Sequence, residues 1–193
     1  MEQIIAAVVG GFLAAGTGWF LDWRREKAKL KQLRKLLTTG ICDDLQHSIS
    51  LYEKVAEEWD KMKTVYFATL NELRESRQTY QNNKDWVTIF DKPELRKKIF
   101  RYYLQSADRF NVLEYQQRRK YEIENKLNDL VRNIKFQDPA ISHDDALKTA
   151  LGYMEAESQE YNNLTQSIPD SIAKLNQFKS TAEDLLDKLQ RLK

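Results

Sequence analysis

Residues 4–35 of this 193-residue chain read IIAAVVGGFLAAGTGWFLDWRREKAKLKQLRK, an apolar run followed by a cluster of arginine and lysine. Residues 4–21 carry no charge, and as an α-helix they would extend about 27 Å, near the thickness of a bilayer core. A cleaved signal peptide would carry its cations before the apolar run. A buried core helix would not explain why the run ends in the aromatic residues expected at a membrane interface. The stretch therefore predicts an uncleaved transmembrane helix over residues 1–22.

The cations after the apolar run predict the orientation of this helix. Between Asp22 and Leu36 there are seven cations and two anions, whereas the whole chain carries a net charge of only +2. The positive-inside rule places this juxtamembrane block, residues 23–36, and all that follows in the cytoplasm, with the N-terminus outside. Contact with anionic lipid headgroups, worth about 1 kcal/mol per cation, explains the block. The residues expected at the membrane interface are Trp19, Trp23, Arg24, Arg25 and Lys27.

Nucleic-acid binding is the weaker interpretation of the basic block. Past Trp23 the block contains no aromatic residue to stack on bases, and no recognition motif accompanies it. We therefore expect the lipid bilayer, not nucleic acid, to be its partner.

Small residues are sorted onto one face of the predicted transmembrane helix. At about 100° per residue, two ladders with a small residue at every fourth position lie side by side, and larger apolar residues face the opposite way. Small side chains let helix backbones approach closely, and polar side chains can form hydrogen bonds between helices. Since only one transmembrane helix is predicted, the simplest partner is a second copy of the chain. The residues expected to line the oligomer axis or a pore are Gln3, Ala6, Ala7, Gly10, Gly11, Ala14, Thr17 and Gly18.

Residues 37–193 predict a cytoplasmic, antiparallel bundle of long helices. Apolar residues recur three and four apart, and no stretch alternates with the period of two that is typical of a strand, so the expected fold class is all-α. Nothing between Leu21 and Leu30 breaks a helix, so the transmembrane helix should continue into the bundle without a linker. The expected inner faces include Leu30, Phe100 and Tyr121.

Turn-forming residues predict where these helices end. Gly40 is a candidate kink or break, and the polar residues 81–85 are the first candidate loop. The sequence further predicts a helix start at Pro93, a helix end at Asp138-Pro139, a capping box at Ser142, and a break or kink at Pro169.

The sequence contains no catalytic or metal-binding motif that we recognise. A zinc site needs three or four ligands at workable spacings, but the chain has only two histidines, His47 and His143, and one cysteine, Cys42. No glycine-rich phosphate-binding loop occurs, and the glutamates near residue 157 lack the histidine partners of a di-iron bundle. We therefore expect a non-enzymatic protein without metal or cofactor, in which Cys42 is a small buried residue.

The opening segment resembles a class of known proteins. A Gly- and Ala-rich single-pass helix, a Trp-Arg-Arg junction and a helical cytoplasmic bundle are similar to the small membrane proteins of bacterial anti-phage systems. These include the pore-forming accessory protein of some RNA-targeting CRISPR loci. The residues that carry the resemblance are Gly10, Gly11, Ala14, Gly18, Trp23, Arg24 and Arg25. The resemblance implies a bacterial inner-membrane protein with a role in phage defence.

A related helical-bundle enzyme class, the HEPN ribonucleases, uses an arginine four to six residues before a histidine. The positions at that spacing before His47 and His143 hold no arginine, so this catalytic pair is missing.

Three functional hypotheses follow. The leading one is a membrane-anchored homo-oligomer that perturbs or permeabilises the inner membrane. The alternative is an anchored structural or adaptor protein whose bundle binds a cytoplasmic protein partner. A membrane-tethered nuclease or nucleic-acid binder is the third, and the missing motifs disfavour it.

Overall fold

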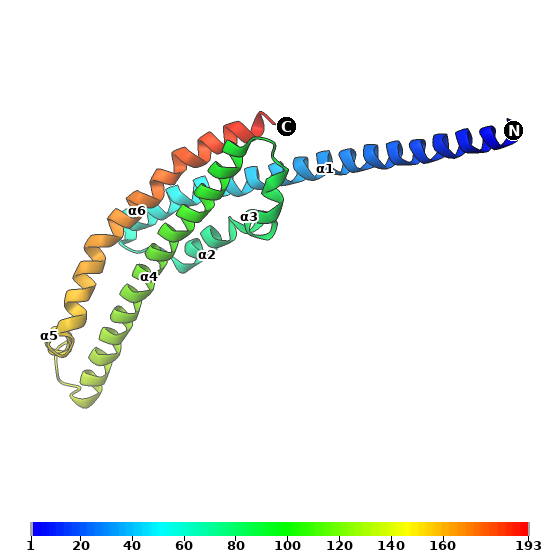
Figure 1. Ribbon diagram of the computed structural model, residues 1–193. Coiled ribbons are helices and arrows are strands. Elements are labelled where there is room, and N and C mark those ends of the chain that lie inside the picture. The colour runs from blue at the N-terminus through cyan, green and yellow to red at the C-terminus, as the bar shows by residue number, and fades with distance from the viewer. Residues whose placement is uncertain (1, 193) are drawn as a thin grey trace.

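A computed structural model describes the backbone of residues 2–192 and the side chains of residues 19–192. Over that backbone the chain forms six α-helices, one short 3-10 helix and no strand, so the all-α prediction is confirmed (Figure 1). The elements are α1 (Glu2–Met62), α2 (Phe67–Glu75), α3 (Gln78–Asn83), η1 (Lys84–Ile89), α4 (Pro93–Gln137), α5 (His143–Tyr153) and α6 (Glu155–Gln190).

Three long helices define the architecture. Helix α6 packs against both α1 and α4 and runs in the opposite direction to each of them (Figure 1). The short elements α2, α3 and η1 cover α1, while α5 closes the far end of the α4–α6 pair. The described part of the chain is therefore a helical bundle, as the apolar periodicity predicts.

Helix α1 continues through Gly40, so the predicted break there is wrong. The reason for a glycine at this position is the close approach of α3. A Cβ atom at Gly40 would lie 2.5 Å from the Cγ2 methyl of Thr79, well inside van der Waals contact. Gly40 therefore lets α3 pack directly on the α1 backbone, and the surrounding helix tolerates its low propensity.

The first loop in the chain lies earlier than the sequence predicts. Helix α1 ends at Met62, and Lys63 adopts the left-handed conformation with φ of 53° before the chain turns into α2. The predicted loop at residues 81–85 is wrong, because α3 and η1 make this stretch helical. Val87 and Phe90 are buried there and tie the segment to the core.

The later helix boundaries are mostly as expected. Helix α4 begins at Pro93 and ends at Gln137, and the backbone N–H of Asp145 donates to Ser142 Oγ at 3.1 Å, which confirms the predicted cap. Helix α6 runs through Pro169 without a break, and the chain instead breaks at Met154, between α5 and α6.

The core consists of two large apolar clusters and one small one. One large cluster, near the start of α4, surrounds Ile41, Ile99 and Leu185, and the central cluster surrounds Val55 and Leu113. The far tip, at the junction of α4 and α5, has only Val131, Ala146 and Ala150 as fully buried apolar residues. The bundle is therefore best packed in its middle and near the start of α4.

Several residues expected on inner faces are exposed instead, among them the three named above. Leu30, Phe100 and Tyr121 have exposed fractions of 52%, 57% and 49%. Leu30 lies before the point where α1 enters the bundle, and Phe100 follows the fully buried Ile99, so it is turned about 100° from the packed face. Periodicity gives the phase of a helix face but not the position where a neighbouring helix stops covering it.

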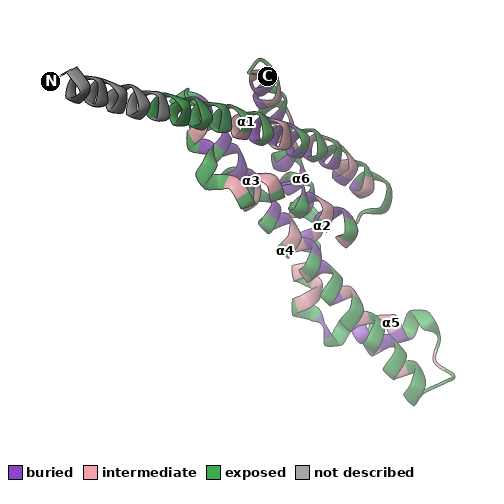
Figure 2. Ribbon diagram, turned by 90° about the vertical axis from the view of Figure 1, so that its right-hand side faces the viewer, coloured by how far each residue is buried: buried purple, intermediate pink, exposed green. Residues whose placement is uncertain are grey.

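Residues 19–32 of α1 project from the bundle as an isolated helix (Figure 2). Each of them is exposed, and the first buried residue among the described side chains of α1 is Leu37. We call residues 19–32 the stalk. Its sequence includes three lysines, two arginines and two leucines, which are strong helix formers, and no glycine or proline, so local propensity favours the helical state there.

Candidate membrane interface

The base of the predicted transmembrane helix carries a group of exposed aromatic and aliphatic side chains. Trp19, Phe20, Leu21 and Trp23 have exposed fractions of 73%, 48%, 53% and 42%. Burying a side chain of this size is worth about 1.5–3 kcal/mol, so leaving four of them in water is unfavourable. A contiguous exposed group of this kind is typical of a surface that meets a membrane or a partner.

Cations of the stalk fold back onto these rings. The Lys27 ammonium lies 4.0 Å from the ring centre of Trp23, and the Arg24 guanidinium lies 5.9 Å from that of Phe20. The rings of Phe20 and Trp23 are 5.9 Å apart. Such cation–π contacts contribute about 0.5–1 kcal/mol each at exposed sites. They place aromatic bodies beside positive charges, the chemical combination found at the boundary of a bilayer.

Arg25 is held differently from its neighbours. Its Nη1 lies 3.7 Å from Asp22 Oδ1, in an ion pair whose two side chains are about three-quarters exposed. An exposed pair of this kind adds little stability, about 0–1 kcal/mol. It does neutralise one of the cations that follow the apolar run, which leaves Arg24 and Lys27 as the charges nearest the rings.

The predicted site residues divide into two groups. Trp19, Trp23, Arg24, Arg25 and Lys27 are described, exposed and adjacent on the stalk, as an interface requires. The side chains predicted to line an oligomer axis lie outside the described residues: Gln3, Ala6, Ala7, Gly10, Gly11, Ala14, Thr17 and Gly18.

Within the part of the chain whose side chains the structure describes, no helix is both long and apolar enough to cross a bilayer. Most of the predicted span, residues 4–21, lies outside that part. The transmembrane helix therefore stays a prediction from the sequence.

The described residues also contain no group of three or more His, Cys, Asp or Glu side chains arranged to hold a metal ion. His47 is exposed on α1, and His143 is exposed at the first residue of α5. Cys42 is buried on the inner face of α1, as expected from its size.

A buried carboxylate that the sequence analysis missed joins α1 to α3. The Thr79 hydroxyl donates to Asp44 Oδ1 at 2.8 Å, and the Tyr80 backbone N–H donates to Asp44 Oδ2 at 3.1 Å. Asp44 thus caps the N-terminus of α3 from a neighbouring helix. Burial raises the pKa of this carboxyl, although the hydrogen bonds oppose the rise. Its spacing, three residues after the buried Ile41 and four before the buried Ser48, was the signal that it faces inward.

A second missed residue is Arg77, which is only 6% exposed. Its guanidinium lies 4.8 Å from the ring centre of Phe110, and its Nε is buried without a hydrogen-bond partner among the described residues. Burial lowers the pKa of this group. The central core therefore contains a cation held by an aromatic face and without an ion pair in the described structure.

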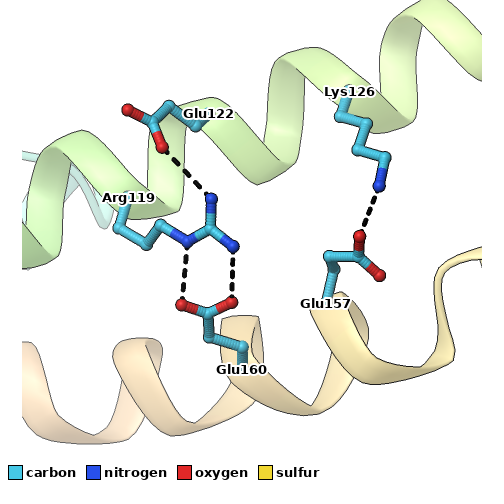
Figure 3. Close-up of polar contacts among 5 residues, drawn as sticks. All are labelled: Arg119, Glu122, Lys126, Glu157 and Glu160. Carbon is cyan, nitrogen blue, oxygen red and sulfur yellow. Dashed lines mark hydrogen bonds and ion pairs between the residues drawn. The ribbon is translucent and has the colours of Figure 1, made fainter.

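The far half of the α4–α6 pair is joined by ion pairs in addition to its apolar contacts (Figure 3). Arg119 donates from Nε and Nη2 to the two carboxylate oxygens of Glu160, both at 2.8 Å, and from Nη1 to Glu122 at 3.2 Å. Lys126, about two turns after Arg119 on α4, pairs with Glu157 of α6. The paired arginine lowers the pKa of Glu160. Glu157 and Glu160 are thus structural partners of α4.

Comparison with known protein families, with curated proteins and with solved structures finds no match for this chain. What the described residues define is a class of architecture: an all-α bundle from which one long helix projects with an aromatic and basic surface.

Proposed function

We propose that this chain is a membrane-anchored, self-associating helical protein of a bacterial inner membrane that perturbs or permeabilises that membrane as an effector of phage defence. Residues 4–21 cross the bilayer with the N-terminus outside, and the bundle faces the cytoplasm. The protein acts without enzymatic chemistry and without a metal or cofactor.

The observation that carries the proposal is the continuity of α1. One helix, Glu2–Met62, includes the predicted span, the exposed aromatic residues and the stalk, and then becomes a core helix of the bundle. A helix without a flexible joint transmits a rotation or tilt of the bundle to its membrane end. This gives a mechanical route from a cytoplasmic event to the bilayer.

Self-association is argued from the sequence of the span. Gly10 and Ala14 belong to the small-residue face on which helices approach closely, and Gln3 and Thr17 add polar groups to that face. Polar side chains gathered on the shared axis of several helices would favour water there, so the same face that joins the subunits provides a path for ions.

The alternative is an anchored adaptor, and exposed aromatic residues at the far tip favour it. Phe136 and Tyr153 are 87% and 74% exposed, at the end of the bundle opposite the stalk. Exposed aromatic residues are enriched where proteins bind partners. In this reading the anchor only localises a bundle that binds a cytoplasmic protein through its tip.

The first test is membrane potential in bacteria that express the full chain, with and without phage. The wild-type chain should depolarise the membrane, and replacing Gly10 and Ala14 with leucine should abolish depolarisation and reduce the oligomer size in detergent. A matched control replaces Val8 and Phe12 with leucine, on the opposite helix face, and should behave as wild type. Unchanged oligomer size and depolarisation in the Gly10/Ala14 variant would show that the proposed axis is wrong.

A second test separates the two candidate functions. Residues 4–21 are exchanged for an unrelated single-pass helix of equal length, with the stalk kept intact. An adaptor should remain functional after this exchange, whereas a membrane effector should lose all depolarisation.

A further inference from the structure

A basic cleft lies where the stalk meets the bundle. It encloses about 420 Å³ and is lined on α1 by Ala28, Lys31, Gln32, Arg34, Lys35 and Thr38, with Leu192 from the chain segment after α6 as the opposite wall. The cleft therefore forms between the first core helix and the last residues that the structure describes.

The charge of the basic cleft is of one sign. Three cations and, among the described residues, no carboxylate line it. Arg34 pairs with Asp91, whereas Lys31 and Lys35 form no ion pair with any described residue. Lys188 and Arg191 nearby pair with Asp184 and Asp187. Two unpaired cations beside a concave surface attract an anion.

Arg34 is oriented by the bundle before any ligand arrives. Its Nη2 donates to the carbonyl oxygen of Ile89 at 2.9 Å and to Asp91 Oδ1 at 2.7 Å. Its Nε is buried and has no hydrogen-bond partner among the described residues. The guanidinium is therefore held in place by the bundle through Nη2, beside Lys31 and Lys35.

The clefts next to it extend the same surface. Leu192 also lines a cleft of about 340 Å³, in which Leu95, Lys92 and Lys98 lie with the carboxylate of Glu94, and a smaller one that contains Arg34 and its partner Asp91. The adjoining clefts thus contain charges of both signs, whereas the basic cleft itself contains cations alone among the described residues.

We propose that the basic cleft binds a phosphate-bearing anion. Lys31 and Lys35 supply the unpaired, flexible charge, Arg34 adds a guanidinium that the bundle holds beside them, and Leu192 packs against the less polar part of the ligand. Two sources of phosphate fit this chemistry: the headgroup of an anionic lipid, and a soluble phosphate compound of the cytoplasm. Only the lipid source rests on the proposed membrane function.

The position of the basic cleft along α1 allows both sources of phosphate to reach it. Ala28 is seven residues beyond Leu21, so the cleft begins roughly 10 Å past the predicted span at 1.5 Å per residue. The headgroup layer occupies about 5–8 Å on each side of the hydrocarbon core. A lysine side chain or a tilted helix closes the remaining gap, so a lipid phosphate can reach the near edge of the cleft, and a soluble ligand can enter from the cytoplasm.

The test uses the full chain in nanodiscs and follows the rate of lysine acetylation by mass spectrometry. The probe for a soluble ligand is inorganic pyrophosphate, added to nanodiscs of phosphatidylcholine and, separately, to the chain in neutral detergent. Pyrophosphate should slow the acetylation of Lys31 and Lys35 severalfold and leave the exposed tip residues Lys135 and Lys148 unchanged. Protection only in nanodiscs that contain phosphatidylglycerol, and stronger at Lys31 and Lys35 than at Lys29, would identify the ligand as a lipid headgroup.

Variants test the same point by affinity. Replacing Lys31 and Lys35 with glutamine should weaken pyrophosphate binding by about tenfold or more if the ligand is soluble. If the ligand is a lipid headgroup, the same variant should weaken, by a similar factor, the protection of Arg34 from arginine-specific labelling. The matched variant, Lys135→Gln with Lys148→Gln, removes equal charge and should bind as wild type. Absence of protection by both probes, or equal losses in the two variants, would overturn the proposal. Because the pyrophosphate measurement in detergent needs no bilayer and no depolarisation, it stands apart from the test of membrane function.

Discussion

Replacing Gly40 with alanine tests the close contact between α1 and α3. The new Cβ would lie 2.5 Å from Thr79 Cγ2 and 3.5 Å from Thr79 Cβ and Oγ1. The methyl group is therefore the single atom of Thr79 that must move, by about 1 Å, to reach ordinary contact distance. Thr79 does not yield freely, because its hydroxyl donates to the buried Asp44 at 2.8 Å.

Two opposing effects set the magnitude. Alanine in a helix interior is better than glycine by about 1 kcal/mol, whereas overpacking a tight contact costs about 1–3 kcal/mol. We expect Gly40→Ala to lower the free energy of unfolding by about 1 kcal/mol, which is a fall of roughly 2–4 °C in Tm for a chain of this size. Thermal unfolding of the full chain in detergent, followed by far-UV circular dichroism, measures it. Gly152→Ala is the control, since nothing lies within 4 Å of its new Cβ, and it should raise stability.

A second substitution makes the prediction sharper. Thr79→Ser keeps the hydroxyl that Asp44 accepts and removes only the methyl group in the way. In the Thr79→Ser background, Gly40→Ala should change sign and stabilise the chain by about 0.5–1 kcal/mol. If Gly40→Ala destabilises both backgrounds equally, the contact with Thr79 is not the reason for glycine at this position.

Three further predictions follow from the described contacts. Arg77→Met removes a buried cation that lacks an ion pair and keeps an apolar side chain against Phe110, so the free energy of unfolding should be unchanged or rise by about 1–2 kcal/mol in urea titrations. A fall of more than about 1 kcal/mol would show that the charge itself is needed. The hydrogen bond from Arg74 lowers the folded-state pKa of Glu114. The ionised Glu114 therefore stabilises the folded chain above its ordinary pKa of 4.5, and this stabilisation is lost as the pH falls through the folded-state pKa. Glu114→Gln should flatten that part of a profile of unfolding free energy against pH. An identical slope in the variant would refute this. Lys29→Pro breaks the exposed stalk helix at a cost of about 3 kcal/mol of local stability, so it should leave the bundle's Tm unchanged and abolish depolarisation, whereas Lys29→Ala should leave both the Tm and the depolarisation unchanged.

The architecture at low detail could be predicted from the sequence because it depends on local patterns. Apolar spacing of three and four with few glycines and prolines is sufficient to predict an all-α bundle, and Pro93 and Ser142 act on their own helices through φ and through capping. The exposed stalk was also predictable in part. A run with alternating Lys, Ala and Leu and no helix breaker predicts a continuous helix, and its aromatic residues predict where it leaves water.

Boundaries that depend on other segments were not predictable in this way. Gly40 was interpreted as a candidate break because glycine has a low helix propensity. The reason for glycine there is its close contact with Thr79, a residue of another helix that the local sequence does not reveal. Residues 81–85 are polar, as in a loop, yet they are helical because Asp44 of the neighbouring α1 caps α3 and Phe90 is buried in the core. In both cases the deciding partner is more than thirty residues away.

The sequence by itself determined the helical class, the local basic block and the apolar run, since each depends on residues within a few turns of one another. Only the tertiary structure decided where α1 becomes buried, which face of α4 is covered, and that Lys31, Arg34 and Lys35 meet Leu192 from the other end of the chain. The physical reason is the range of the interactions. Helix propensity and capping act within one or two turns, whereas burial and a shared cleft require segments that folding brings together.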